Sequence, residues 1–424
     1  MPSAGKGDTA GDFASAGHPE GLPTHGADCI QRIGERGITR VFTAIVAALG
    51  VATAVAMILL WPGDVDSRVG EAIVTKSDEA TVLSVDEYAC SSFQSTVCQQ
   101  VRIRLESGPD SGRVKELILG NPAIDPEVSE GDELRVVKNI VPPGADPVPG
   151  REYSISDFQR QQPMLWLAIA FALVVVLFGR LRGALSLVGL GLSIAVVLVF
   201  MVPAILNGES ALAVAVVGSV AVMLATILLA HGTGPKSMAA ILGTAVALVV
   251  TVGLAVLFTE LTHLTGRATE EATFLQINAS GISLDGLLLA GMIVAALGVL
   301  DDVTVSQSST VLALRAANPG QSFRELFMRA MDVGRDHVSA TVNTLVLAYV
   351  GASLPLLLIF SSGQIPLLDA VNLEIIANEI VATLVGSIGL IAAVPITTAL
   401  AALLAVRMTE DEVARTDTSH GHPH

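Results

Sequence analysis

The chain is organised around residues 286–315, which read GLLLAGMIVAALGVLDDVTVSQSSTVLALR. This stretch is long enough to cross a membrane, because about 20 apolar residues span the bilayer core as a helix. Two adjacent carboxylates, Asp301 and Asp302, stand inside it. Ionised carboxylates at that depth are costly unless they face protein, water or a partner. The pair either has a function or marks the cytoplasmic end of the helix. The uncharged residues 303–314 favour a function.

Neighbouring positions on a helix lie about 100° apart, so the two carboxylates cannot face the same partner. Asp302 shares its helix face with small residues, Gly291, Gly298 and Ser309. Rows of small residues let membrane helices approach closely. We therefore predict that Asp302, rather than Asp301, points into the helix bundle.

The composition places the chain among integral membrane proteins, because 51% of its 424 residues are hydrophobic. The net charge of −16 argues against a nucleic-acid partner, since no basic stripe is available to neutralise phosphates. The sequence contains no Walker A loop, zinc signature or nucleophile elbow. We therefore expect no enzymatic activity, no cofactor and no metal site.

The N-terminal part of the chain divides by composition. Residues 1–40 are mostly Gly, Ala, Asp, His and Pro with scattered polar residues, which predicts a disordered tail. Residues 41–61 form an apolar run preceded by Arg32, Arg36 and Arg40, which predicts a first transmembrane helix with a cytoplasmic N-terminus. Residues 62–162 lack any spanning stretch and are predicted to form an extracytoplasmic β domain.

Short β-rich runs separated by turns fill this domain, at residues 69–76, 79–85, 97–107, 112–119 and 132–141. Five such strands suit a small OB-like barrel. A proline-rich linker, residues 141–150, then returns the chain to the membrane. Cys90 and Cys98 flank a loop of seven residues, so a disulfide is chemically allowed, and two free thiols are the equal alternative.

Seven further apolar runs follow, at residues 164–178, 184–205, 211–230, 238–258, 286–314, 338–360 and 379–406. With the first run they predict a polytopic α-helical membrane protein of eight transmembrane helices. Most basic residues of the connecting segments then fall on one side, which predicts cytoplasmic termini. Residues 163–406 form the seven-helix domain and residues 407–424 a cytoplasmic tail. Residues 322–331 and 367–380 are predicted to be short surface helices.

Polar residues on the last three predicted transmembrane helices lie at similar depths to the aspartates. A buried proton or cation site needs such carboxylates, amides and hydroxyls. The alternative is that each polar residue merely bonds a neighbouring helix. Pro355 and Pro395 are candidate hinges. The candidate site residues are Asp301, Asp302, Ser306, Ser309, Asn343, Thr344, Thr397 and Thr398.

Two segments carry a resemblance to a known family. They are GVLDDVTVSQSSTVLALR, ending at Arg315, and GRDHVSATVNTLVLAYVGASLPLLL, which begins at Gly334. Together with the β domain they resemble the YibE/F family of bacterial membrane proteins, over roughly residues 41–406. The family name implies no reaction. The last three helices are more distantly similar to RND-type permeases, including the SecD/SecF group, which implies that Asp301 and Asp302 carry protons.

We therefore expect a transport-type protein of the bacterial inner membrane, coupled to protons or cations through the aspartate pair. Its partners would be the lipid bilayer and an envelope protein or small ligand at the β domain. The alternative is a non-transporting scaffold whose β domain binds an envelope partner and whose aspartates only bond helices. An intramembrane aspartyl protease is disfavoured, because its two aspartates must come from different helices.

Overall fold

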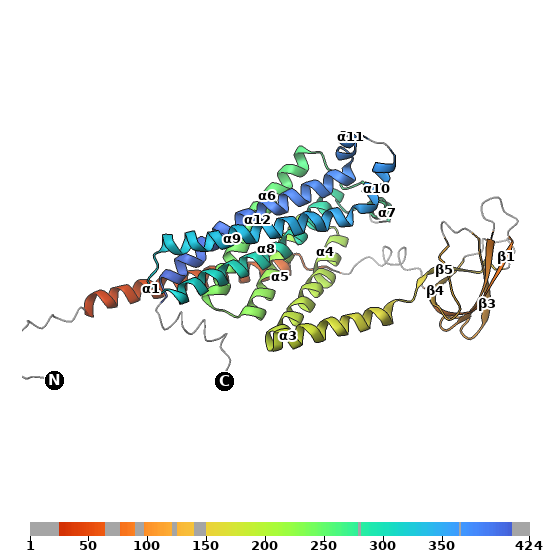
Figure 1. The fold of residues 1–424 in the computed structure, drawn as a ribbon, viewed down its shortest axis with the longest axis horizontal. Coiled ribbons are helices and arrows are strands. Elements are labelled where there is room, and N and C mark those ends of the chain that lie inside the picture. The colour runs from red at the N-terminus through yellow and green to blue at the C-terminus, as the bar shows by residue number, and fades with distance from the viewer. Residues whose placement is uncertain are drawn as a thin grey trace, which may run out of the picture.

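A computed structural model describes residues 25–63, 77–89, 97–120, 125–139, 150–278, 281–363 and 366–408. Long helices lie side by side in a bundle, and a small β-sheet stands apart from them at the start of α3 (Figure 1). The apolar composition of the long helices explains this separation, because they expose large hydrophobic side chains that suit contact with lipid.

The sheet contains the strands β1 (Asp78–Ala89), β2 (Val97–Leu105), β3 (Val114–Leu119), β4 (Glu133–Lys138) and β5 (Tyr153–Phe158). All paired strands are antiparallel, in the order β3-β2-β1-β4-β5. The edge strands approach each other, and the Ile118 N–H donates to the Gly150 carbonyl at 3.2 Å. The sheet is therefore a half-barrel around a core that includes Val82, Ile103 and Leu134.

The predicted strands fit this sheet in part. Four of the five expected runs correspond to β1, β2, β3 and β4. The expected strand at 69–76 and most of the proline-rich linker lie outside the described residues. The strand β5 was not predicted, because its sequence YSISDF has only two strongly apolar residues at alternating positions before Phe158. Pairing with β4 makes it a strand.

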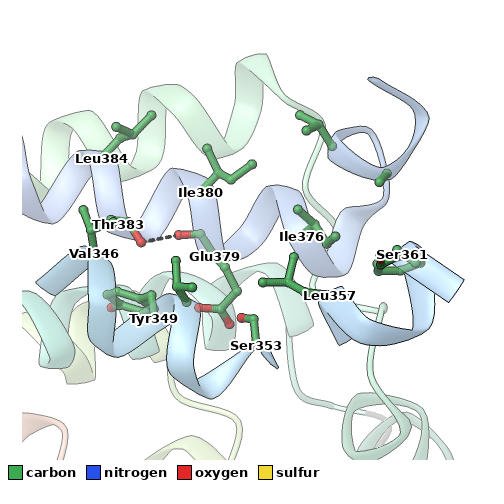
Figure 2. Close-up of a pocket in the computed structure, with 14 residues that line it drawn as sticks. Val346, Tyr349, Ser353, Leu357, Ser361, Ile376, Glu379, Ile380, Thr383 and Leu384 are labelled. Carbon is green, nitrogen blue, oxygen red and sulfur yellow. Dashed lines mark hydrogen bonds between the residues drawn. The ribbon is translucent and has the colours of Figure 1, made fainter. Parts of the chain in front are cut away.

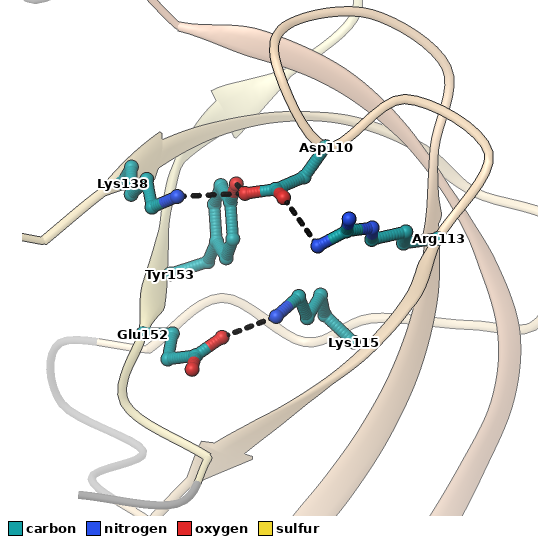
Figure 3. Close-up of polar contacts among 6 residues, drawn as sticks. All are labelled: Asp110, Arg113, Lys115, Lys138, Glu152 and Tyr153. Atoms are coloured by element: carbon teal, nitrogen blue, oxygen red, sulfur yellow. Dashed lines mark hydrogen bonds and ion pairs between the residues drawn. The ribbon is translucent and has the colours of Figure 1, made fainter. Parts of the chain in front are cut away.

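The Asp110 carboxylate links the loop after β2 to the strands β4 and β5 (Figure 3). Asp110 accepts hydrogen bonds from Lys138 Nζ and from the Tyr153 hydroxyl, both at 2.7 Å. Arg113 donates to its other oxygen at 3.0 Å. The hydrogen bond from Lys138, followed by that from Tyr153, lowers the pKa of Asp110 from 3.8 to about 2. Asp110 therefore stabilises the sheet in its ionised form.

This lowered pKa predicts acid weakening of the β domain. The stabilisation from Asp110 is fully present above pH 3.8, its ordinary value, and is lost as the pH falls through about 2. Hydrogen exchange of β4 and β5 in the full chain, corrected for the intrinsic pH dependence, is expected to accelerate over that window.

Asp110→Asn should show fast exchange already at neutral pH. Asp157→Asn is the control, because its ion pair with Arg160 is solvent-exposed. Equal exchange in all three proteins at neutral pH would contradict this role.

The helices are α1 (His25–Leu59), α3 (Gln161–Ala195), α5 (Ala211–His231), α6 (Pro235–Leu261), α7 (Glu270–Asn278), α8 (Leu284–Ala317), α9 (Phe323–Ala352), α10 (Leu354–Ser362), α11 (Leu367–Val371) and α12 (Glu374–Val406). A short π-helix, η1 (Val196–Met201), and α4 (Val202–Leu206) continue α3. The central helix is α8, which packs against α5, α6, α9 and α12.

Among the described residues, six helical segments are long and apolar enough to span a membrane, or seven if α9 and α10 form one bent span. One of the six runs from residue 161 to 206 and would measure about 69 Å if straight, more than twice the bilayer core. It is not straight. Arg180 has φ 51° and ψ −131°, and a Cβ on Gly183 would overlap the Val175 carbonyl, eight residues earlier. The chain folds back here, and the predicted count of eight depends on this reversal.

The segment before the last two predicted spans differs from expectation. A separate surface helix at 322–331 was predicted, but α9 runs without interruption from Phe323 to Ala352. A capping box between Ser322 and Glu325 starts it. The helix then bends by 60° into α10, where Pro355 lies at the first turn. Pro395, by contrast, lies inside α12, which continues through it.

Candidate functional site

Asp301 lies at the middle of α8, 17 residues from Leu284 and 16 from Ala317. Its Oδ2 accepts a hydrogen bond from the Thr226 hydroxyl of α5 at 2.9 Å. Its Oδ1 is buried and has no hydrogen-bond partner among the described residues. A buried oxygen without a partner loses the full value of its hydration. Binding of a proton, a cation or water at Oδ1 would therefore stabilise Asp301.

Two cavities meet at Asp301. One has a volume of about 370 Å³ and extends past Ser219 on α5. The other has a volume of about 240 Å³ and reaches His231 at the end of α5. Ser193, Thr226 and Asp301 line both cavities.

The linings of the two cavities together extend along α5. The stretch from Ser219 to His231 covers twelve residues, or about 18 Å of helix. The Ser219 hydroxyl is itself buried without a partner in the described structure. Hydroxyls, a carboxylate and an imidazole therefore line the two cavities, which lie among α3, η1, α5 and α8.

The prediction that Asp302 faces the bundle is wrong. Asp302 is exposed, as are Gly291 and Gly298 on the same face, whereas Asp301 is partly buried. The face of α8 that packs inward carries Ile293, Leu300 and other residues with larger side chains. The small residues leave space beside α8, and Gly298 lines the larger cavity.

Thr398 belongs to a second polar cluster. Gln307 of α8 donates from Nε2 to the Thr398 hydroxyl of α12 at 2.7 Å and to the Ala330 carbonyl of α9 at 2.9 Å. One amide thus connects three helices. Gln307 was not among the predicted site residues, although a glutamine inside a spanning run is a signal for such a bond.

The remaining candidates lie apart from Asp301's two cavities. Ser306 is 3.2 Å from Nδ1 of His337 on α9, and Ser309 donates to the Val305 carbonyl of its own helix. Thr397 is buried against Gly243 of α6, and its hydroxyl has no partner among the described residues. Asn343 and Thr344 are exposed on α9. Similar depth in the membrane therefore did not bring the eight predicted residues into one site.

Two further points concern metals and cysteines. In the described part of the chain, no group of three or more His, Cys, Asp or Glu side chains is placed to hold a metal ion. Cys98 is disulfide-bonded. Cys90 lies outside the described residues, so its pairing with Cys98 stays a prediction.

Comparison with known families adds to this picture. A family model described as YibE/F-like protein matches residues 167–407, or 241 of the 424 residues, which include α5 to α12 and Asp301. The chain belongs to the YibE/F-like family. The predicted family membership is thus confirmed, and the similarity to RND-type permeases stays a prediction. No curated protein and no solved structure matches the chain. This YibE/F-like chain is a membrane protein, with helices long and apolar enough to cross a bilayer.

Proposed function

We propose that this YibE/F-like protein is a transport-type protein coupled to protons through Asp301. It would span the bacterial inner membrane eight times, with both termini in the cytoplasm and the half-barrel outside. Eight spans result if the reversal at Arg180 divides one of the six spanning segments into two and if α9 and α10 together form one bent span. Arginines before the first span support a cytoplasmic N-terminus. We propose no enzymatic reaction.

The observation that carries this proposal is the unsatisfied Oδ1 of Asp301 where the two cavities meet. An ionised carboxylate inside a membrane helix costs several kcal/mol, and no ion pair to Asp301 occurs among the described residues. Binding a charge-neutralising ligand relieves that cost. The cavities on either side supply the space for the ligand to arrive and leave.

A proton is a better ligand here than a metal cation. A hard cation takes six or more oxygen ligands. Among the described residues, Asp301 has only the Thr226 hydroxyl as a hydrogen-bonded neighbour from another helix, and Asp302 is exposed. A proton needs a single oxygen, and Oδ1 is free to take it. We therefore assign the coupling to protons, with Asp301 as the carrier.

The alternative is a scaffold in which the bond from Thr226 to Asp301 only joins α5 to α8. Hydrogen bonds of this kind contribute to helix association in membranes. The half-barrel would then bind an envelope protein or a small ligand. In that case Asp301 would not change its protonation during function.

Infrared difference spectroscopy distinguishes these functions. Purified protein in lipid should show a carboxyl band that appears and disappears as the pH is cycled near neutrality. Asp301→Asn should remove that band, and Asp302→Asn should leave it. A band that survives in Asp301→Asn, or folded wild-type protein without one, would contradict proton carriage by Asp301.

A further inference from the structure

A cavity lies away from Asp301, between α9, α10, α11 and α12. Its volume of about 610 Å³ is in the range of sites that bind drug-sized molecules. Most side chains that line it are apolar, such as Val350, Leu357 and Leu384. None of its lining residues is Lys or Arg. The cavity can therefore enclose a hydrophobic body of moderate size.

The bend after α9 creates this cavity. Proline has no N–H, so Pro355 cannot donate to the Gly351 carbonyl four residues earlier, and α10 leaves the direction of α9 by 60°. The helix α10 then lines the cavity through Leu357, Phe360 and Ser361, opposite α12. The cavity occupies the space between the two helices.

One acidic side chain enters this apolar space. Glu379 reaches from α12 toward α9, where its carboxylate lies beside Tyr349 and Ser353 (Figure 2). No hydrogen bond or ion pair to the Glu379 carboxylate occurs within the described residues. Thr383 donates only to the backbone carbonyl of Glu379. Glu374, five residues earlier on α12, differs in this respect. Its carboxylate accepts from the Thr265 and Gly266 backbone N–H groups at 2.5 and 2.7 Å.

We propose that this cavity binds a small organic cation that has an apolar body and an ammonium group. The Glu379 carboxylate would pair with the ammonium, and the Ser353 hydroxyl would accept a second hydrogen bond. The Tyr349 ring adds a cation–π contact, which organic ammonium ions favour. The apolar walls enclose the body of the ligand. The site uses none of the residues around Asp301.

The test measures binding of dansylcadaverine, a fluorescent dye with a terminal ammonium, to the full chain in phosphatidylcholine nanodiscs. An analogue with a terminal hydroxyl in place of the amine is the neutral probe. Glu379→Gln is expected to weaken dansylcadaverine binding about tenfold or more, because the negative charge that pairs with the ammonium is removed. The neutral probe should bind the wild type and Glu379→Gln equally. Val350→Trp should weaken both probes by filling the cavity.

Asp369→Asn is the matched control, because Asp369 lies exposed on α11 and does not line the cavity. It should leave dansylcadaverine binding unchanged. Equal dansylcadaverine binding by wild type and Glu379→Gln would overturn the proposal. Loss of wild-type binding in nanodiscs that contain phosphatidylethanolamine would assign the site to the lipid headgroup and also overturn it. Neither result bears on Asp301, since the assay reads binding and not proton transfer.

Discussion

Asp301→Asn is expected to reduce proton-driven charge movement to the level of protein-free liposomes. The assay places the full chain in proteoliposomes on a solid-supported membrane and applies an acid step. Asparagine keeps the size of aspartate and its bond from Thr226, but it cannot bind and release a proton at the position of Oδ1. The variant should therefore insert and fold like the wild type while losing the signal.

Asp302→Asn is the control for this experiment. The residue is adjacent and removes the same charge, but its side chain is exposed and lies outside both cavities. We expect most of the charge movement to remain. Loss of the signal in Asp302→Asn with retention in Asp301→Asn would reverse the assignment. An unchanged signal in both variants would leave the scaffold as the better explanation.

The second large effect is a loss of stability, which we expect when a side chain is added at the contact between α6 and α12. A Cβ placed on Gly243 would overlap the Thr397 hydroxyl oxygen and lie 2.9 Å from the Thr397 Cβ. The two helices approach this closely only because Gly243 has no side chain. Overpacking of this kind costs about 1–3 kcal/mol. Gly243→Ala should therefore lower the melting temperature of the protein in detergent.

Gly253→Ala tests whether that loss comes from packing. Gly253 lies on the same helix, and a Cβ there would have no neighbour within 4 Å. Alanine favours a helix over glycine, so this variant should melt at or above the wild-type temperature. Adding Thr397→Ala to Gly243→Ala should recover part of the loss. A melting temperature that is unchanged in Gly243→Ala would show that α6 can move away from α12.

The sequence predicted the membrane class, most helix positions and four of the five strands, because hydropathy and turn residues act locally. It predicted Asp301 and Asp302 as unusual residues but assigned the wrong one to the interior. The small-residue face of α8 resembles a packing face, yet its position depends on where α5, α9 and α12 lie. No pattern within α8 contains that information.

The hydrogen-bond partners of the candidate residues could not be predicted from the sequence either. Thr226 is recognised as the partner of Asp301, and Gln307 as the partner of Thr398, only from the folded structure. Glu379 was read as the first residue of a span rather than as part of a site. Its carboxylate lies in the cavity that α10 lines, and it has no hydrogen-bond or ion-pair partner among the described residues.

The amide of Gln307 couples the position of α8 to the positions of two neighbouring helices. Gln307 lies six residues after Asp301, about 9 Å farther along the same helix. Because one amide donates to the Ala330 carbonyl and to the Thr398 hydroxyl, a rotation of α8 would strain its bonds to α9 and α12 together. A movement of α8 that follows proton binding at Asp301 would thus involve α8, α9 and α12 together. Of those three, α9 and α12 carry Tyr349 and Glu379 at the other end of the bundle.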